Sequence, residues 1–294
     1  MDLIININKP SGISSLQAVT KVKRIFGVRK AGHTGTLDPL ATGVLLVCLG
    51  EATKVSRFFL DMDKKYRARV KLGERTDTCD AEGRVVERKD ASSVTEDQLV
   101  KVVKMFEGEI TQRPPMYSAV KVHGERLYKL ARKGIEIDRP ERRVRVYDLK
   151  VTATQLPYFD MEVSCSKGTY IRTLCDDIGV VLGPGAHLVA LERSAVGFFD
   201  IANAVSLSEL GSDVFQAVCK KAFYSLDEAL SELKELVLEQ NDYEKAKNGV
   251  AIKSLNSNDL ALGSFVRMKS PSGQLFGIGT VDKGYVRVER ILNL

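Results

Sequence analysis

Apolar residues alternate with polar ones, or run together in short blocks, over six stretches that predict β-strands. These stretches are residues 3–8, 44–49, 66–72, 144–154, 158–166 and 187–191. Apolar residues at helical spacing predict helices over residues 14–26, 95–106, 126–133 and 170–182. Ser14 and Thr95 begin capping-box patterns that mark the start of the first two helices. Because strands and helices are mixed and the tight turns favour antiparallel pairing, we predict an α+β fold with a large mixed, mainly antiparallel sheet and flanking helices.

The pattern changes near the C-terminus. Residues 226–238 predict the last helix of the large domain, and beyond about Asp242 the sequence has short strand-like runs. These runs are separated by predicted turns at residues 270–273, 277–279 and 282–284. We therefore predict a large domain over residues 1–241 and a small C-terminal β-barrel over residues 242–294.

Composition favours a globular, cytoplasmic protein. The 294 residues are 44% hydrophobic and 28% charged, and the longest aliphatic stretch, residues 44–49, is far shorter than the roughly 20 residues that span a bilayer. The N-terminus has no basic region and no cleavage site, which predicts a cytoplasmic location. Five cysteines without a C-x-x-C pair and three histidines without ligand spacing predict reduced packing cysteines and no metal site.

Positive charge is concentrated in one part of the chain. Residues 113–150 hold 11 lysine and arginine residues against 5 aspartate and glutamate residues, an excess equal to the formal net charge of +6. Such a patch favours a polyanionic partner, because each phosphate contact releases a counterion. A solvated, charge-rich hairpin and helix would have the same composition, so charge alone leaves both interpretations open.

Residues 32–45 carry the candidate chemistry and have the sequence GHTGTLDPLATGVL. Three glycines let the backbone turn sharply and approach a ligand, and Pro39 keeps Asp38 out of a helical conformation. The apolar strand that follows anchors this loop. A carboxylate on a rigid loop is how a protein presents a nucleophile or a base, although an ordinary turn hydrogen bond from Asp38 would account for the same residues.

The same stretch resembles the catalytic motif of the TruB family of pseudouridine synthases, G-H-x-G-x-L-D-P-x-A-x-G-x-L, at every fixed position. Other blocks typical of that family follow in the same order and cover nearly the whole chain. They are NKPSG at residues 8–12, KYR at 65–67, RPPMYSA at 113–119 and KGTYIRTL at 167–174. The resemblance is weakest over the C-terminal part.

Three residues take catalytic roles by this resemblance. Asp38 matches the nucleophilic aspartate, and Arg172 matches the arginine that pairs with that carboxylate and keeps it ionised. Tyr66 matches the tyrosine that stacks on the target base and moves a proton late in the reaction. Taken singly, Tyr66 is equally a half-buried core aromatic on a strand, and Arg172 an ordinary surface charge.

Three further residues take substrate-binding roles by the same resemblance. His33 matches a residue that holds the rearranged T-loop and the flipped nucleotide. Tyr170 and Leu191, together with Tyr66, match residues that line the uracil pocket. Singly, His33 is equally a turn residue, and Tyr170 and Leu191 are packing residues; only their joint occurrence in family order favours the functional interpretation.

The resemblance implies an isomerase that converts the T-loop uridine at position 55 of tRNA into pseudouridine by base flipping. It implies tRNA, through its T-arm, as the partner of a monomeric enzyme, without cofactor, metal or membrane. Residues 113–145 resemble a thumb loop that closes over RNA, and the C-terminal barrel resembles an RNA-binding PUA-like domain. The chain also lacks a Walker A motif and a strand-turn-helix G-x-G-x-x-G motif.

One residue departs from the family pattern. Glu192, in the Glu192-Arg193-Ser194 segment, stands where the family commonly has the first of two arginines. A possible phosphate contact is therefore replaced by a like charge, which weakens the expected local grip on RNA without affecting the chemistry.

Three other functions compete with this one. A non-catalytic RNA-binding or tRNA-folding factor would use the same basic surface, but Asp38, Tyr66 and Arg172 are intact. A synthase of a guide-RNA particle would carry extra N-terminal sequence and a full PUA domain, whereas this chain begins close to its NKPSG block. A glycoside hydrolase built on Asp38 needs a second carboxylate as acid, and the motif blocks contain no candidate.

Overall fold

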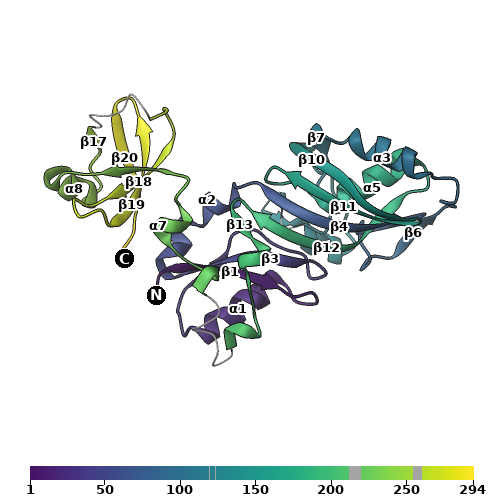
Figure 1. Cartoon of the computed structure of the whole chain (residues 1–294), viewed down its shortest axis with the longest axis horizontal. Coiled ribbons are helices and arrows are strands. Elements are labelled where there is room, and N and C mark those ends of the chain that lie inside the picture. Colours follow the sequence, from purple (N-terminus) through teal and green to yellow (C-terminus); the bar gives the residue numbers. More distant parts are fainter. Residues whose placement is uncertain (119, 123, 212–219, 254–259) are drawn as a thin grey trace.

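The computed structural model describes residues 1–118, 120–122, 124–211, 220–253 and 260–294, so Ala119 of the RPPMYSA block and Cys219 lie outside the described residues. Figure 1 shows an elongated molecule with a small sheet at one end and a large sheet along the rest. Both termini lie near the junction of the two parts (Figure 1).

The large sheet has eleven strands among the described residues. They are β1 Leu3–Lys9, β2 Ala31–His33, β3 Thr42–Leu49, β4 Lys64–Leu72, β7 Gly108–Gln112, β10 Arg142–Gln155, β11 Tyr158–Cys165, β12 Ala186–Val196, β13 Phe199–Asp200, β14 Val205–Ser206 and β15 Phe223–Ser225. Eight of them follow the order β14-β1-β3-β12-β4-β11-β10-β7. The pairs β1–β14 and β3–β12 are parallel, and the other described pairs are antiparallel. The predicted α+β fold with a mixed, mainly antiparallel sheet is confirmed.

Helices lie on both faces of the large sheet and beside the small one. They are α1 Ser15–Ile25, α2 Ser56–Leu60, α3 Glu96–Lys104, α4 Leu127–Arg132, α5 Ile171–Leu182, α7 Leu226–Ala229 and α8 Gln240–Lys247, with short 3₁₀ helices at η1 Gly50–Val55, η2 Ile201–Asn203, η3 Glu209–Gly211 and η4 Lys220–Ala222. The capping boxes predicted at Ser14 and Thr95 are present and begin α1 and α3. The predicted strand over residues 44–49 is buried throughout, as its continuous apolar sequence required.

Strands β1 and β3 separate two hydrophobic clusters. Their alternate side chains, such as Ile5 and Leu45, point to the main core with α1, α3 and α5. The side chains between them, such as Ile4 and Leu46, point to a second cluster that includes residues of the small C-terminal sheet. Both faces of these strands are therefore buried, and the loop that precedes β3 is attached to a close-packed part of the core.

Gly43 permits the parallel contact between β3 and β12. It has φ +102°, and a Cβ at this position would lie 2.3 Å from the carbonyl oxygen of Arg193. Only glycine allows this approach, since an L side chain would both strain the backbone and collide with the neighbouring strand. The last glycine of the GHTGTLDPLATGVL motif thus allows β3 and β12 to pair beside the candidate site.

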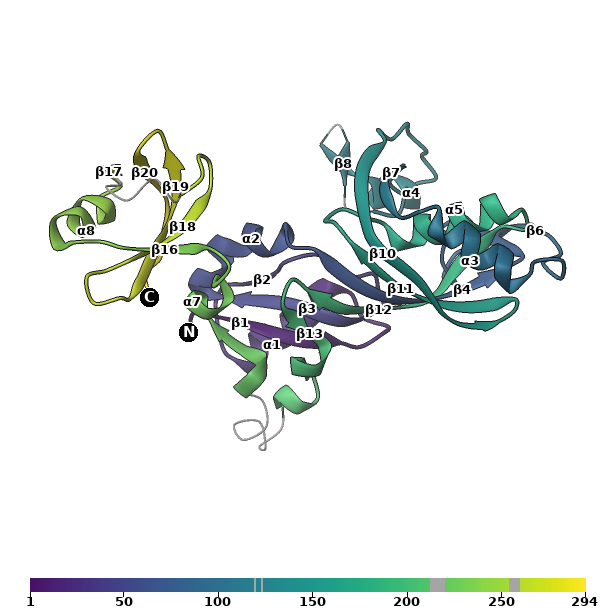
Figure 2. The ribbon, with the colours of Figure 1, turned by 45° about the horizontal axis from the view of Figure 1, so that its top comes forward.

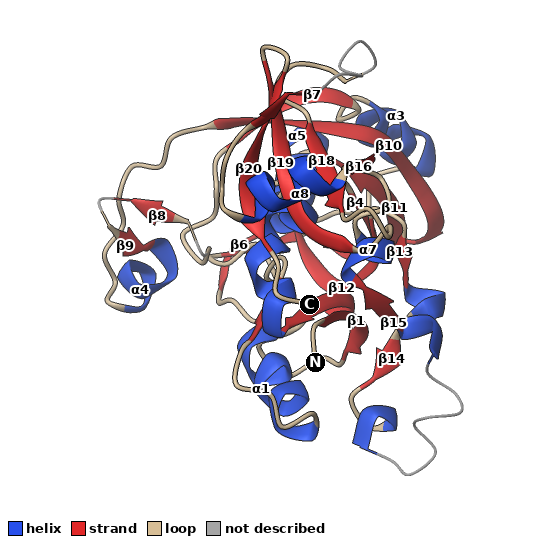
Figure 3. Cartoon of the chain, turned by 90° about the vertical axis from the view of Figure 1, so that its left-hand side faces the viewer, coloured by secondary structure: helices blue, strands red, loops and turns tan. Residues whose placement is uncertain are grey.

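Two hairpins extend from the large sheet. One is formed by β5 Glu74–Thr76 and β6 Val85–Arg88, and the other by β8 Lys121–Val122 and β9 Glu125–Arg126. The second hairpin leads into α4 and stands out from the body of the molecule (Figures 2 and 3). The short helix predicted over residues 126–133 is thus confirmed as α4.

The C-terminal sheet has five strands in the order β16-β18-β19-β20-β17. They are β16 Lys234–Val237, β17 Ile252–Lys253, β18 Phe265–Lys269, β19 Leu275–Asp282 and β20 Tyr285–Ile291. Helix α8 lies at the outer end of the molecule, nearest the viewer in Figure 3. The predicted small β-barrel is present as a five-stranded half-barrel sheet among the described residues, and its first strand begins before residue 242, where the sequence placed the division.

Two sequence predictions in this region were wrong. Residues 226–238 do not form one helix: α7 ends at Ala229, and β16 pairs in parallel with β18. The side chain of Arg267 donates to the carbonyl of Leu233, 2.9 Å away, so tertiary pairing replaces helical hydrogen bonds. Residues 277–279 are not a turn but lie inside β19. A Cβ at Gly279 would lie 2.3 Å from Val286, so this glycine allows close strand packing.

Candidate active site

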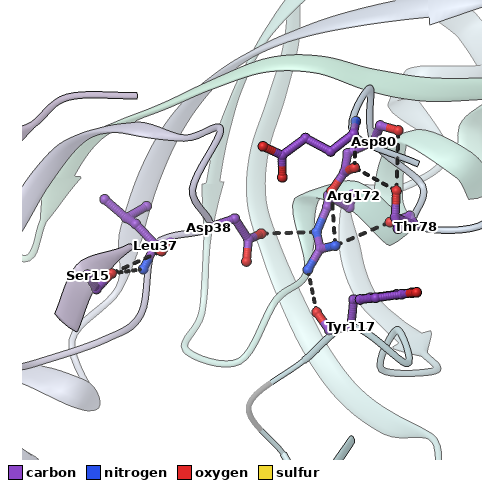
Figure 4. Close-up of polar contacts among 8 residues, drawn as sticks. Ser15, Leu37, Asp38, Thr78, Asp80, Tyr117 and Arg172 are labelled. Atoms are coloured by element: carbon purple, nitrogen blue, oxygen red, sulfur yellow. Dashed lines mark hydrogen bonds and ion pairs between the residues drawn. The ribbon is translucent and has the colours of Figure 1, made fainter. Parts of the chain in front are cut away.

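The Asp38 loop is held from both sides. The backbone N–H of Leu37 donates to the Ser15 hydroxyl at 2.8 Å, and that hydroxyl lies 2.9 Å from the Leu37 carbonyl (Figure 4). The N–H of Gly12 donates to the carbonyl of Pro39 at 2.9 Å. The start of α1 and the turn after β1 therefore fix the residues on either side of Asp38, as a site built on rigid elements requires.

Lys9 supports the same loop from within the protein. Its side chain is fully buried, and Nζ donates to the carbonyls of Pro10 and Ile13, both at 2.8 Å, and of Pro39 at 3.4 Å. Burial lowers the pKa of Lys9 to about 8, and the nearby Asp38 carboxylate opposes that change. Lys9 thus joins the turn after β1 to the catalytic loop.

Arg172 lies at the centre of the site and is 5% exposed. Its Nε forms an ion pair with Oδ2 of Asp38 at 3.0 Å, and its Nη1 donates to Oδ2 of Asp80, also at 3.0 Å (Figure 4). Its Nη2 donates to the carbonyl of Tyr117 at 2.7 Å, and Nη1 also reaches the carbonyl of Thr78 at 3.3 Å. The planar guanidinium is therefore fixed by four acceptors, a role that lysine could not fill.

Asp80 is a second carboxylate beside Asp38, but it does not face the cavity. It is 3% exposed and accepts hydrogen bonds from the Thr78 hydroxyl at 2.6 Å and the backbone N–H of Glu82 at 3.1 Å, in addition to Arg172. Its lone pairs are thus used within the protein. Asp80 orients Arg172, and it lacks the exposed position that the acid of a glycoside hydrolase needs.

Burial and the neighbouring cations change the pKa of Asp38 in opposite directions. Burial raises the pKa of Asp38 above its usual 3.8, while Arg172, Lys9 and Arg193 lower it and the Asp80 charge raises it. The net direction is upward, so Asp38 is a stronger base than an exposed aspartate. Without the three cations, desolvation would favour the neutral, unreactive acid.

A cavity of ≈390 Å³ opens in front of Asp38. It lies between the Asp38 loop, the centre of the sheet, the start of α5 and the base of the projecting hairpin. Its lining residues are Gly35, Thr36, Leu37, Asp38, Leu60, Lys64, Tyr66, Ser118, Val120, Ser166, Gly168, Thr169, Tyr170, Ile171, Arg172, Leu191 and Arg193. Asp38 and Arg172 place charge at its floor, and apolar and aromatic side chains form its walls.

Five of the six predicted residues meet at this cavity: Asp38, Tyr66, Tyr170, Arg172 and Leu191 all line it. Tyr66 lies on β4 and Leu191 on β12, and these two strands are neighbours in the sheet. Tyr170 directly precedes α5. Burial raises the pKa of the Tyr66 hydroxyl above its usual 10.0, so it keeps its proton at neutral pH.

His33 lies on β2, just before the catalytic loop, and is not among the residues that line the cavity. Burial and the nearby Arg193 lower its pKa, so the ring is neutral at pH 7. Its Nδ1 is buried and has no hydrogen-bond partner within the described part of the chain. The ring therefore has an unused polar atom close to the loop.

Sequence reasoning missed Arg193. It is 2% exposed, and it donates from Nε to the carbonyl of Val44 at 2.8 Å and from Nη2 to the carbonyl of Gly35 at 3.1 Å. It therefore connects β12 to both ends of the catalytic loop and reaches the cavity. Glu192, which was expected to weaken the grip on RNA, pairs with Arg67 at 3.1 Å.

Asp80, Lys9 and Lys64 were also missed. Lys64 donates to the carbonyl of Leu60 at 2.6 Å and to that of Met62, and burial lowers its pKa to about 8. The available signal was position: Lys64 directly precedes the KYR block, and Lys9 lies within NKPSG. For Asp80 the sequence offered only a polar loop.

No group of three or more His, Cys, Asp or Glu side chains among the described residues is placed to hold a metal ion. None of the described helices is long and apolar enough to cross a bilayer.

Comparison with known proteins gives close matches over almost the whole chain. Residues 23–171 match the family model of the N-terminal domain of TruB family pseudouridylate synthases, and residues 172–238 match that of the tRNA pseudouridylate synthase B C-terminal domain. The chain is 41% identical to tRNA pseudouridine synthase B of Clostridium tetani, covering 99% of this chain and 100% of that protein. It is 43% identical to the protein of that name from Pasteurella multocida, covering 99% and 95%.

Solved structures of similar shape include protein chains from RNA–protein particles. A chain from an H/ACA particle bound to a substrate RNA containing 2′-deoxyuridine is 25% identical with a TM-score of 0.76, covering 99% of this chain and 85% of that one. A chain from a Cbf5–Nop10–Gar1 complex is 28% identical with a TM-score of 0.76, covering 98% and 84%. From the full-length matches, this chain belongs to the TruB family of pseudouridylate synthases.

Proposed function

We propose that this chain is the tRNA pseudouridine synthase that isomerises uridine 55 in the T-loop of tRNA. The curated relatives that it matches at 41% and 43% identity over nearly their full length carry the name tRNA pseudouridine synthase B. The chains from the H/ACA particle and the Cbf5–Nop10–Gar1 complex are more distant, at 25% and 28% identity. This difference favours a synthase that acts on tRNA without a guide.

The observation that carries the proposal is the carboxylate of Asp38, held at 3.0 Å by Arg172 at the floor of a cavity lined by aromatic and apolar groups. A single presented carboxylate with a fixed cation suits a nucleophile or base. The rest of the cavity suits a planar pyrimidine, and the buried Ser118 hydroxyl, without a partner among the described residues, is available to bind the base edge.

The reaction breaks the C1′–N1 bond of uridine, rotates the uracil, and forms a C1′–C5 bond. The hydrogen on C5 then leaves as a proton, and N1 ends protonated, so no external oxidant, reductant or group donor is consumed. Asp38 acts either by attack on the base or the sugar or by removing a ribose proton. Tyr66, whose hydroxyl keeps its proton at neutral pH and lines the same cavity, is suited to exchange a proton late in the reaction.

The target base has to leave its stack before chemistry. A stacking contact with Tyr66 would offset about 1–3 kcal/mol of the free energy needed to unstack the base. Tyr170, Leu191 and the nearby His33 would hold the flipped nucleotide and the rearranged loop. The thumb-like segment 113–145 reaches the site through the Tyr117 carbonyl, which accepts from Arg172.

Exposed cations on and after α1 suit an RNA backbone. Lys21, Lys23, Arg24, Arg29 and Lys30 follow one another on and after α1, and none forms an ion pair within the described residues. Charges of this kind are free to bind phosphates and to make affinity depend on salt. These residues lie outside the basic stretch 113–150 that was predicted from the sequence.

We extend the proposal to organisation and location. The large domain, taken in sequence as residues 1–241, would be catalytic, and the small sheet, taken as residues 242–294 with β16 added, would be a PUA-like RNA-binding unit. The enzyme would act in the cytoplasm as a monomer on the T-arm of tRNA.

The test is tritium release from tRNA labelled at C5 of uridine, with wild type and Asp38→Asn compared. Release approaching one tritium per tRNA, mapped to position 55 and absent from the variant, is the expected result. Tight binding without release by wild type would instead favour an RNA-folding factor. Release from another uridine would contradict position 55 as the target but would still support the isomerisation reaction.

A further inference from the structure

The segment between β3 and β4 joins the active site to the small C-terminal sheet. It contains η1 and α2, and it connects the strand that follows Asp38 to the strand that carries Tyr66. Its last helical residue, Leu60, lines the active-site cavity. What fixes α2 therefore also fixes one wall of that cavity.

The small sheet contacts α2 through three consecutive side chains. Phe58 packs edge-on against Phe265 of β18, with ring centroids 4.9 Å apart. The Arg57 guanidinium lies 5.0 Å from the Phe265 ring and pairs with Glu289 of β20 at 2.9 Å. The buried Phe59 belongs to the same hydrophobic cluster as residues of β19.

The C-terminal tail adds polar contacts to η1. The backbone N–H of Asn293 donates to Glu51 at 2.9 Å, and Lys54 donates to the carbonyl of Ile291 at 3.3 Å. The Asn293 hydrogen bond, followed by that from Lys54, lowers the pKa of Glu51. Apolar, cation–aromatic and polar contacts thus attach the small sheet to one short segment.

The other end of α2 is tied to the active site. Lys64, which lines the cavity, donates to the carbonyl of Leu60 at 2.6 Å. Asp61 pairs with Lys167 at 2.8 Å, at the start of the loop that forms the opposite wall. Leu60, the last residue of α2, is therefore held by Lys64 on one side, and the next residue, Asp61, is held by Lys167 on the other.

We propose that the small C-terminal sheet is a positioning element of the active site, which sets the cavity wall at Leu60 through the Phe58–Phe265 and Arg57–Glu289 contacts. This inference rests on the proposed function, because it assigns the sheet a part in the chemical step. Binding RNA and shaping the cavity are separate roles. Only the second requires that a change at the junction of sheet and helix alter the rate with RNA already bound.

The test is a single-turnover assay of the full-length protein on unmodified tRNA at saturating enzyme, with the tRNA Kd measured separately. Phe265→Ala is expected to lower the saturating rate about tenfold, since small displacements of a positioned group are costly. Glu289→Gln, which removes the charge that pairs with Arg57 at 2.9 Å and with Arg290 at 3.9 Å, should give a smaller loss in the same direction. Tyr285→Ala, on the exposed side of β20, is the matched control and should leave the rate unchanged.

A double-mutant cycle distinguishes an effect that acts through Leu60 from a general destabilisation of the protein. If Phe265 acts through Leu60, then Phe265→Ala should have little further effect in a Leu60→Ala background, because coupled residues are not additive. Thermal unfolding of each variant shows that the large domain remains folded.

Four outcomes decide the matter. A weaker Kd with an unchanged saturating rate in both Phe265→Ala and Glu289→Gln would overturn the inference and leave an RNA-contact role only. Fully additive losses in the cycle would overturn it as well. A coupled loss of rate supports it. No turnover by wild type would overturn the proposed function itself, and the inference with it.

Discussion

Replacing Arg172 by lysine tests the central claim about the site. The substitution keeps one positive charge but replaces a fixed planar group by a flexible point charge. Arg172 contacts Asp38, Asp80 and the carbonyls of Thr78 and Tyr117 at 2.7–3.3 Å. A lysine ammonium has a shorter reach and cannot satisfy these four acceptors at once.

The expected loss follows from how Arg172 is held beside Asp38. Its Nη1 donates a hydrogen bond to the charged Asp80 carboxylate, and such a bond contributes about 1.5–3 kcal/mol; if this positioning acts mainly in the transition state, its loss lowers the rate about 10- to 150-fold. Arg172→Met should be worse and should change the pH profile. Removing the main cation raises the pKa of Asp38 further, so activity should be lost at a higher pH as the solution is acidified.

The assay is single-turnover tritium release at saturating enzyme between pH 5.5 and 9. Arg75→Lys is the matched control, since Arg75 forms a two-point pair with Asp176 at 2.7 and 2.9 Å outside the cavity. That control should keep the wild-type rate. An Arg172→Lys enzyme within threefold of wild type, with an unchanged pH profile, would refute the reasoning.

Three other outcomes are expected. Asp38→Asn should abolish tritium release and retain tRNA binding. Because the folded-state pKa of Asp38 is raised, its ionised form costs stability once the pH exceeds that pKa, so this variant should unfold at a higher temperature than wild type at pH 7, and a lower Tm would contradict the sign. Tyr66→Phe keeps the stacking face but loses the hydroxyl; it should bind RNA normally and react about 10²–10⁴-fold more slowly, and a wild-type rate would exclude proton transfer by this residue. Gly43→Ala should lower the free energy of unfolding by about 2–5 kcal/mol in urea, since its Cβ meets Arg193 at 2.3 Å, whereas Gly124→Ala, with open space around it, should cost less.

Local signals in the sequence predicted much of the fold. The side-chain oxygens of Ser14 and Thr95 cap the helices they precede, because such caps depend only on residues three positions away. The same reasoning failed over residues 226–238, where β16 forms through contacts with β18. The partners in that case, such as Leu233 and Arg267, lie 34 residues apart in sequence.

The residues of the candidate site likewise divide into those that local sequence predicted and those that depend on distant partners. Asp38 was found because the loop around it is one continuous motif, whereas Asp80 and Arg193 were not. Asp80 and Arg172 are 92 residues apart, and Arg193 and Val44 are 149 apart. Spacing within one sequence has no information on such pairs. The burial of Arg193, which makes it a support of the loop rather than a surface charge, depends on the assembled sheet.

The place of β12 has a consequence for how the chain reaches its native state. Strands β3 and β4 follow each other in sequence, yet β12 lies between them and pairs with both. During synthesis these two strands have unpaired edges until residues 186–196 emerge. Non-local pairing of this kind slows folding and leaves edges open to wrong partners. The catalytic loop can therefore take its final shape only late, and a nascent chain that stops before β12 should be bound by chaperones and be catalytically inert.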